Sequence, residues 1–520
     1  MNLDHRRSKQ EGRGQLQHRR LWPLYVFLLA PGVLAGESKL DLGIFAGQDS
    51  GEVASFLVVM RTQADLAGAE RFARKEEKGR FVYEALREHA EATQASLRER
   101  LRLAGVPFRP FFLVSMIEVK ADRALATELA RREDVVAVAA NRPVSLPANP
   151  LRSLEDAAAS PAAVEPNIEK IRAPELWASG FRGQGIVVAV ADTGVTWDHP
   201  ALRERYRGFD GSSVSHDYNW HDAMHAGPEN ACGVDSVAPC SDDGHGTACA
   251  GIIVGNEGAN QIGVAPEARW IACRNMIHGE GTPASYTECF QFFLAPTDAA
   301  GRNPRPDLAP DVISNSWSCL PDEGCTDANV LRAVVENTRA AGIFVASSAG
   351  NNGSACFTVN MPPAIYEASF SVGATTLADA IASFSSRGPV TVDGSGRLKP
   401  DLVAPGVGVR TARSPSGYGT FGGTSAAAPH VAGAVALLYS AAPNLRGRPA
   451  EAGEILKRSA VALTTAQDCG GVSGAAVPNA VFGFGRLDVA AAAALAAPVA
   501  RTPPQPPTPS RTPRALRPRE

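Results

Sequence analysis

Several features are scarce in this chain of 520 residues, and each scarcity narrows the class of protein. Charges of opposite sign nearly cancel, with 51 Lys and Arg against 54 Asp and Glu, so no basic excess suggests nucleic acid as a partner. No internal repeat is apparent. Because 520 residues exceed the length of one ordinary domain, we expect two or three folding units. Hydrophobic residues make up 44% of the chain, which is typical of a globular protein with a substantial core.

The N-terminus lacks an apolar run long enough to span a bilayer. The run "LWPLYVFLLAPGVLAG" falls short of the roughly 20 residues required, and the basic letters "HRR" precede it. With the small residues Val33 and Ala35 near its end, this pattern predicts a signal peptide over residues 1–35 and a secreted protein, extracellular or periplasmic. A twin-arginine signal at Arg19 and Arg20 and a retained membrane anchor are the alternatives. We expect no stable membrane association.

The chain has nine cysteines, an odd number, so at least one has no partner within the chain. Export permits disulfides. Two pairs that are close in sequence are predicted to bond: Cys232 with Cys240, and Cys319 with Cys325. The pairing of four others stays open: Cys273, Cys289, Cys356 and Cys469. We predict that Cys249 is the unpaired thiol, because "HGTACAGIIVG" indicates a tightly packed helix that would accept a small apolar group.

Composition and hydrophobic periodicity divide the chain into regions. Residues 36–150 are predicted to hold an α+β unit and the start of a linker, with strands over 55–60, 111–121 and 135–146 and helices over 83–105 and 124–134. An Ala- and Pro-rich linker opens the main body, 151–497. The tail, 498–520, is rich in Pro and Arg and is predicted to be disordered.

Within the main body, short runs rich in Val, Ile and Ala alternate with helical stretches. Runs such as "GIVVAVAD", "ARWIACRNM", "PDVISNSW", "GIFVASSAG" and "SFSVGA" suit a parallel sheet that is covered on both faces. The sequence therefore predicts an α/β fold, in which reactive groups gather at the carboxyl ends of the strands.

Four polar residues stand at strand ends or helix starts. Ser425 opens an Ala-rich helix, Asp192 ends one predicted strand, Asn351 ends another, and His245 opens a Gly-rich helix. Singly, each has an ordinary interpretation as a cap or turn residue, and His245 also as a metal ligand. Together they supply what acyl transfer requires: a nucleophile, a base, a carboxylate to orient the base, and a donor to the oxyanion.

Seven segments then give a specific resemblance. In order, "VAVADTGV", "DDGHGTACAG", "ISNSWS", "SSAGNNG", "FSSRGP", "KPDLVAPG" and "GTSAAAPHVAG" resemble the signatures of the subtilisin-like serine peptidases, closest to their bacillopeptidase F-like secreted bacterial members. The resemblance covers about residues 165–497. It implies a three-layer fold around a mainly parallel sheet, and it implies that the α+β unit is an inhibitory propeptide domain.

The resemblance also implies roles for individual residues. Ser425 would be the nucleophile, His245 the general base, Asp192 its orienting carboxylate, and Asn351 the oxyanion donor. Two backbone edges would bind an extended substrate, and the residues assigned to substrate binding are Gly279, Glu280, Gly281, Ser316, Trp317, Ser318 and Asn352. Because Asn352 and Asn360 are neutral, we expect an apolar side chain before the scissile bond.

The expected partners are protein or peptide substrates and the chain's own propeptide, which would act as an inhibitor. We expect the protein to be a monomer. We expect no nucleic acid, no metal ligands in the active site and no cofactor for catalysis. Structural calcium, which relatives often bind, stays an open alternative without support in the sequence. Two other functions stay open as well, namely a selective processing peptidase and a catalytically inactive peptide-binding relative.

Overall fold

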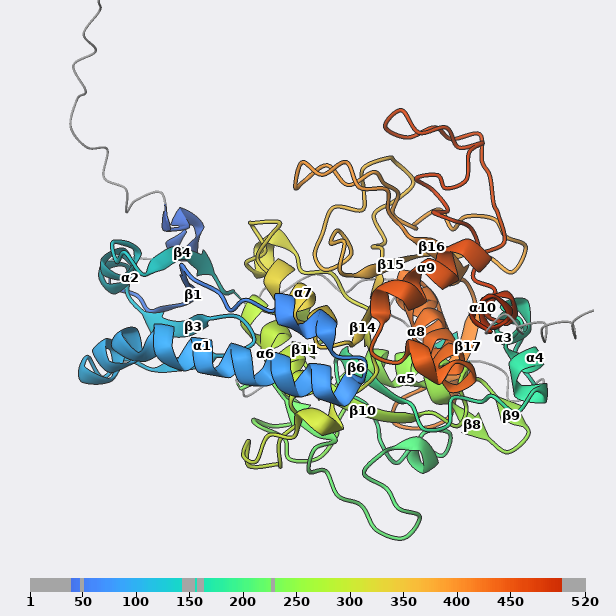
Figure 1. Ribbon diagram of the computed structural model, residues 1–520, viewed down its shortest axis with the longest axis horizontal. Coiled ribbons are helices and arrows are strands. Elements are labelled where there is room, and N and C mark those ends of the chain that lie inside the picture. Colours follow the sequence, from blue (N-terminus) through green and yellow to red (C-terminus); the bar gives the residue numbers. More distant parts are fainter. Residues whose placement is uncertain (1–38, 47–50, 143–154, 157–162, 226–229, 498–520) are drawn as a thin grey trace, which may run out of the picture. The chain divides into compact units, whose positions relative to one another are not determined.

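The computed structural model describes residues 39–46, 51–142, 155–156, 163–225 and 230–497, and Figure 1 shows their helices and strands. The predicted signal peptide, most of the predicted linker and the tail over 498–520 lie outside the described residues. Among the described helices, none combines the length and the apolar character that crossing a membrane requires.

The α+β unit is built on an antiparallel sheet of four strands in the order β2-β3-β1-β4. Its elements are β1 (Ala54–Met60), α1 (Lys75–Leu103), β2 (Phe108–Phe111), β3 (Met116–Ala121), α2 (Arg123–Ala130) and β4 (Val135–Ala140). The prediction of one strand over 111–121 is wrong, because a turn separates β2 from β3. Leu113 and Val114 in that turn are buried, so hydrophobicity alone does not reveal the turn.

The main body is organised around a sheet of seven strands in the order β16-β15-β14-β13-β6-β10-β7. All neighbouring strands run parallel. The strands are β6 (Val187–Asp192), β7 (Trp220–Asp222), β10 (Arg269–Arg274), β13 (Val312–Asn315), β14 (Phe344–Ser348), β15 (Phe370–Thr375) and β16 (Leu402–Pro405). The predicted α/β fold with a parallel sheet is therefore confirmed.

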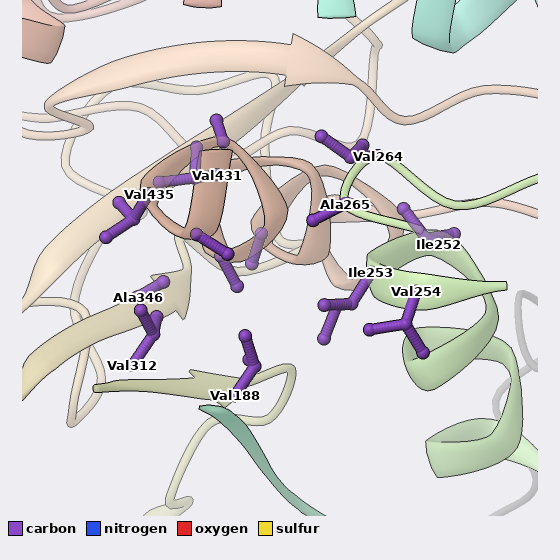
Figure 2. Packing of buried hydrophobic residues seen from close by; sticks show 14 of the residues in the cluster. Val188, Ile252, Ile253, Val254, Val264, Ala265, Val312, Ala346, Val431 and Val435 are labelled. Carbon is purple, nitrogen blue, oxygen red and sulfur yellow. The ribbon is translucent and has the colours of Figure 1, made fainter. Parts of the chain in front are cut away.

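Successive side chains of the sheet point to opposite faces, and each face is covered by helices. Val188 and Val190 belong to a cluster with α5 (His245–Val254) and α8 (Thr424–Ala441). Ala189 and Ala191 belong to another cluster, with α6 (Pro283–Leu294) and α7 (Arg332–Ala340). Figure 2 shows part of the first cluster, with Val188 of the sheet below Val431 and Val435 of α8. The result is the predicted three-layer arrangement.

The remaining elements lie around this body. The helices are α3 (Pro166–Lys170), α4 (Ala173–Ala178), α9 (Pro449–Ser459) and α10 (Val489–Ala496). The short strands are β5 (Glu155–Asp156), β8 (Asn256–Glu257), β9 (Asn260–Gln261), β11 (Met276–Ile277), β12 (Glu280–Gly281), β17 (Val409–Ala412) and β18 (Tyr418–Phe421). β5 pairs with β18, which in turn pairs with β17.

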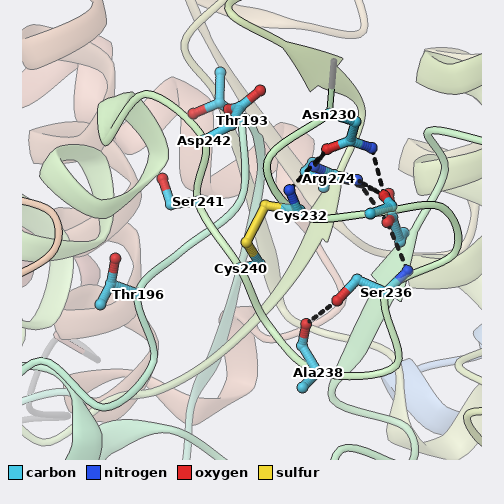
Figure 3. Close-up of a disulfide and its surroundings, with 12 residues drawn as sticks. Thr193, Thr196, Asn230, Cys232, Ser236, Ala238, Cys240, Ser241, Asp242 and Arg274 are labelled. Carbon is cyan, nitrogen blue, oxygen red and sulfur yellow. Dashed lines mark hydrogen bonds and ion pairs between the residues drawn. A yellow bond between two sulfur atoms is a disulfide. The ribbon is translucent and has the colours of Figure 1, made fainter. Parts of the chain in front are cut away.

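Four disulfides cross-link the main body, and both pairs predicted from the sequence are confirmed. The two pairs left open are Cys273 with Cys289 and Cys356 with Cys469. Cys249 is free and buried, as predicted. Figure 3 shows the disulfide between Cys232 and Cys240 beside Arg274. The guanidinium of Arg274 forms a buried ion pair with Asp222.

The loop that follows Asp192 is tightly packed against this cross-linked segment. A Cβ added to Gly194, which has φ +93°, would lie 1.8 Å from the carbonyl oxygen of Cys240, so only glycine fits. The adjoining Ser241 pairs with Gly194 through an isolated β-bridge. The disulfide therefore helps to fix the backbone next to the end of β6.

Candidate active site

Asp192 and His245 form a close buried pair. Asp192 ends β6, His245 is the first residue of α5, and Oδ1 of Asp192 lies 2.7 Å from Nδ1 of His245. The same oxygen accepts a hydrogen bond from the amide of Thr193 at 2.8 Å. Burial lowers the pKa of His245, but the charge of Asp192, its hydrogen bond to the imidazole and the nearby Cys249 together outweigh burial and hold that pKa well above its ordinary value. The carboxylate is thus arranged to orient the imidazole and to stabilise its protonated form.

Ser425 is the second residue of α8 and is 8% exposed. Its Oγ donates a hydrogen bond to the carbonyl oxygen of Ser316 at 3.0 Å, and the hydroxyl of Ser316 donates to the carbonyl oxygen of Ser425 at 3.0 Å. In this resting arrangement the hydroxyl of Ser425 is directed at Ser316. Among the described residues, no hydrogen bond joins this hydroxyl to His245.

Asn351 follows β14 and is held by one neighbour. Its Oδ1 accepts hydrogen bonds from both the amide and the hydroxyl of Thr424, each at 2.9 Å. These two bonds occupy the amide oxygen and leave the Nδ2 group as the donor toward the start of α8. Gly423, with φ +111°, lies against that group, since an added Cβ would be 3.3 Å from Nδ2. Nδ2 of Asn351 and the backbone amide of Ser425 are thus the groups that the sequence prediction assigns as donors to a developing oxyanion.

The two predicted substrate-binding edges take different local forms. The first edge, residues 279–281, ends in β12, which pairs with β11. The second edge, residues 316–318, follows β13 without continuing as a strand, because β13 ends at Asn315. The Trp317 indole donates to the carbonyl oxygen of Ala191 at 3.1 Å and stacks on Tyr286. Asn352, assigned to the same function, is exposed.

Cys249 lies one helical turn beyond His245. Its Sγ is 4.0 Å from Nδ1 of His245 and 3.7 Å from the carbonyl oxygen of Ser425. Potential metal-ligand atoms of Asp192, His245 and Cys249 all lie within 4.8 Å of one another. Burial raises the pKa of the Cys249 thiol, so the sulfur is expected to be protonated and slow to react.

Sequence reasoning missed three residues that support this arrangement. Thr193 and Thr424 supply the hydrogen bonds described above, and the ring of Phe421 meets the imidazole of His245 edge-on, with ring centroids 5.2 Å apart. Thr193 and Thr424 lie within the quoted segments, and Phe421 lies two residues before the last of them. The motifs mark the reactive side chains, but they do not reveal which neighbour orients them.

Comparison with known proteins gives a match to the family model Peptidase_S8, "Subtilase family", over residues 183–485. That range is more than half of the chain. The chain belongs to the subtilase family. This confirms the family predicted from the seven segments, and the parallel sheet covered by helices on both faces agrees with the subtilisin fold.

Several relatives of this subtilase come from Bacillus subtilis (strain 168). The chain is 38% identical to "Bacillopeptidase F" over 370 residues, which is 68% of this chain and 24% of that protein. It is 33% identical to "Major intracellular serine protease" over 277 residues, covering 52% and 74% of the two chains. It is 32% identical to "Subtilisin E" over 280 residues, covering 53% and 61%. The chain thus matches about a quarter of the length of bacillopeptidase F.

The fixed amide of Asn351 leads to a first prediction. Replacing it in Asn351→Leu removes one oxyanion donor without adding charge, so kcat should fall by roughly a hundredfold to a thousandfold while KM changes little. Steady-state kinetics on a peptide substrate measures both constants. Asn329→Leu, at an exposed position with no assigned role in binding or catalysis, is the matched control and should keep kcat within about threefold. A fall in kcat of less than tenfold in Asn351→Leu would contradict the assignment.

A second prediction concerns the thiol of Cys249, which lies one helical turn after His245. A mercurial on Sγ of Cys249 should displace His245 and inhibit slowly, since the sulfur is buried and protonated. Cys249→Ser should retain most activity and lose this sensitivity, and its buried hydroxyl should lower stability modestly. Activity is followed over time with and without the mercurial. Equal inhibition of both proteins would show that the reagent acts elsewhere.

Proposed function

We propose that this subtilase is a secreted serine endopeptidase that hydrolyses peptide bonds through an acyl-enzyme intermediate. The observation that carries the proposal is the buried pair of Asp192 and His245 next to Ser425 at the start of α8. The donor group of Asn351 supports it. An inactive peptide-binding relative would not require a carboxylate, an imidazole and an oriented amide around one serine.

The proposed reaction follows from the positions of these groups. Oγ of Ser425 attacks the carbonyl carbon of the scissile bond, while Nε2 of His245 takes the hydroxyl proton. Asn351 and the backbone amide of Ser425 stabilise the resulting oxyanion. The tetrahedral intermediate collapses, the C–N bond breaks, and His245 donates the proton to the leaving amine. Water then attacks the acyl-enzyme in the same way and regenerates Ser425.

The substrate is proposed to be an extended peptide that lies along the first and second edges. Main-chain hydrogen bonds would provide affinity with little dependence on sequence. The neutral Asn352 supports a preference for an apolar side chain before the scissile bond. A selective processing peptidase with the same chemistry is the alternative, and the identity of the cleaved proteins separates the two.

We further propose that the α+β unit is the inhibitory propeptide of a monomeric enzyme. Its contacts with the main body support this: the side-chain oxygen of Gln291 on α6 accepts hydrogen bonds from the amides of Phe112 and Leu113. Asn337 on α7 donates to the carbonyl oxygen of Leu113 at 2.7 Å. The amide of Arg142, near the end of the unit, donates to the carbonyl oxygen of Glu323 at 3.0 Å. The unit thus reaches the neighbourhood of the first edge.

Export is the third part of the proposal. The four disulfides in the main body support it, since such bonds persist in oxidising compartments. The mechanism above uses only groups of the chain itself.

The nucleophile assignment has a direct test. Ser425→Ala cannot form the acyl-enzyme, so casein cleavage should fall by roughly a millionfold and the full-length precursor should accumulate. Mass spectrometry of the unsubstituted enzyme should place the mature N-terminus between about residues 147 and 165. Normal self-processing by Ser425→Ala would refute the nucleophile, and an active enzyme that begins near Ser38 would refute the propeptide.

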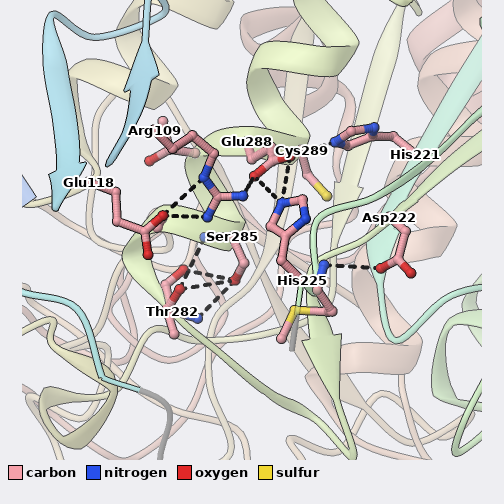
Figure 4. A network of polar contacts seen from close by, with 12 residues as sticks. Arg109, Glu118, His221, Asp222, His225, Thr282, Ser285, Glu288 and Cys289 are labelled. Atoms are coloured by element: carbon pink, nitrogen blue, oxygen red, sulfur yellow. Dashed lines mark hydrogen bonds and ion pairs between the residues drawn. The ribbon is translucent and has the colours of Figure 1, made fainter. Parts of the chain in front are cut away.

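One polar network between the α+β unit and the main body depends on protonation (Figure 4). Arg109 of β2 donates to the buried carboxylate of Glu288 on α6 and also pairs with Glu118 of its own unit. His221 and His225 bind the same Glu288 carboxylate through Nε2, at 2.7 and 2.9 Å. Nδ1 of His225 lies 2.5 Å from Asp235. Arginine and two histidines therefore share one carboxylate.

The charges in this network set the sign of a pH effect. Burial lowers the pKa of His225, Glu288 raises it, and Arg109 lowers it, with a net result above its ordinary value. Removing the α+β unit removes the positive charge of Arg109, and this change raises the pKa of His225 further. The separated main body therefore binds protons more tightly than the complex, so acid favours separation.

We accordingly predict that the cleaved α+β unit dissociates at least threefold faster at pH 5.5 than at pH 8. Samples of the self-cleaved complex are incubated at each pH and assayed for activity at one fixed pH, which separates release from catalysis. His225→Gln should flatten the dependence, because the amide does not titrate. Faster release at pH 8, or an unchanged dependence in His225→Gln, would contradict the prediction.

A further inference from the structure

Glu323 is a buried carboxylate that the proposed chemistry does not use. It is 1% exposed and lies in the loop 319–325, which the disulfide between Cys319 and Cys325 closes. Its carboxylate has three hydrogen-bond partners among the described residues, and all three are donors. Oε2 accepts from the amide of Leu320 at 2.8 Å, and Oε1 accepts from the amide of Gly281 at 3.2 Å and the hydroxyl of Tyr286 at 3.1 Å.

Two of these contacts lead to the two substrate-binding edges. Gly281 is the last residue of the first edge, so the bond from its amide ties that edge to the closed loop. Tyr286 stacks on Trp317 of the second edge, with ring centroids 3.9 Å apart. A Cβ added to Gly281 would lie 2.6 Å from the Tyr286 ring, so edge and ring are already in close contact. One carboxylate therefore connects both sides of the proposed substrate cleft.

We propose that Glu323 is a positioning residue that fixes the spacing between the first edge (279–281) and the second edge (316–318). This inference rests on the proposed peptidase function. Glu323 does not touch the reacting atoms. It acts through Gly281 and Tyr286, and the closed loop around it limits the movement of the carboxylate.

The position of the edges determines which substrates are affected. The carbonyl oxygen of Ser316 accepts from the nucleophile, so the second edge adjoins the scissile bond. A peptide that extends further on its acyl side also reaches the first edge. Loosening the first edge should therefore weaken binding of long peptides and leave short peptides unaffected. The chemical step should not change in either case.

Protonation provides a second consequence. With the α+β unit in place, as in this structure, burial raises the pKa of Glu323 to about 7, the three donors oppose this shift, and the charge of Glu280 adds to it. The titratable groups around Glu323 are Glu280, Tyr286 and the adjacent Asp322, while Arg142 contacts it through a backbone amide. Above that pKa the carboxylate accepts charge-assisted bonds, and below it one oxygen carries a proton and accepts less well. The hydrogen bond from the amide of Gly281 to Glu323 should therefore weaken as pH falls below about 7.

The test compares KM for two peptide substrates, with two and four residues on the acyl side of the same scissile bond. In Glu323→Gln the KM of the longer peptide should rise about fivefold, which corresponds to one lost hydrogen bond, with kcat and the shorter peptide unchanged. Asp322→Asn, at the exposed neighbouring residue, is the matched control and should leave both KM values unchanged.

A measurement on the unsubstituted enzyme keeps the inference testable even if the variant does not fold. The ratio of the two KM values, long over short, should rise between pH 8 and pH 6, and in Glu323→Gln it should stay high and flat. A ratio that does not change with pH, an equal effect on both peptides, or a lowered kcat with constant KM would overturn the role of Glu323. Absence of any cleavage by the unsubstituted enzyme would instead refute the proposed function.

Discussion

The common direction of the seven strands is the constraint on which the site depends. Because all neighbouring strands run parallel, Asp192, the second edge and Asn351 all follow carboxyl ends of strands and meet at one side of the sheet. The helices α5 and α8 begin at the same side, with His245 and Ser425 in their first turns. Residues distant in the sequence are thus brought together by the topology, with little dependence on any single loop.

The electrostatics of the site follow from this placement. Asp192 is 1% exposed, and a buried carboxylate requires compensation. The amide of Thr193 and the imidazole of His245 provide it, and the pairing raises the pKa of His245. At the start of α8 the amides of Thr424 and Ala426 are bonded to Asn351 and Gly423, so the amide of Ser425 is the backbone group proposed as an oxyanion donor. Asn351 carries the second proposed donor, and Thr424 sets its orientation. One side of the site therefore favours a proton on the imidazole, and the other favours a negative oxygen.

The sequence predicted those parts of the protein that depend on local pattern. The strand before Asp192, the helix starts at His245 and Ser425, and the two short-range disulfides all involve residues close together in the chain. Other features depend on distant partners. The bond between Cys273 and Cys289 joins a strand to a helix, and Glu323 meets Gly281 from a loop 42 residues away. The sequence pattern did not reveal the turn between β2 and β3, because the apolar residues of this turn are buried against the main body.

The disulfide between Cys356 and Cys469 affects the resistance of the enzyme to autolysis. It joins residues separated by 113 positions, and closing a loop of that length lowers the entropy of the unfolded chain by an amount worth about 4–5 kcal/mol in the loop-closure model. A peptidase cleaves extended chains, so a molecule of the enzyme that unfolds locally becomes a substrate for other molecules of the same enzyme. Linking the segment after β14 to the region before α10 restrains such opening, and autolysis should be slower for it.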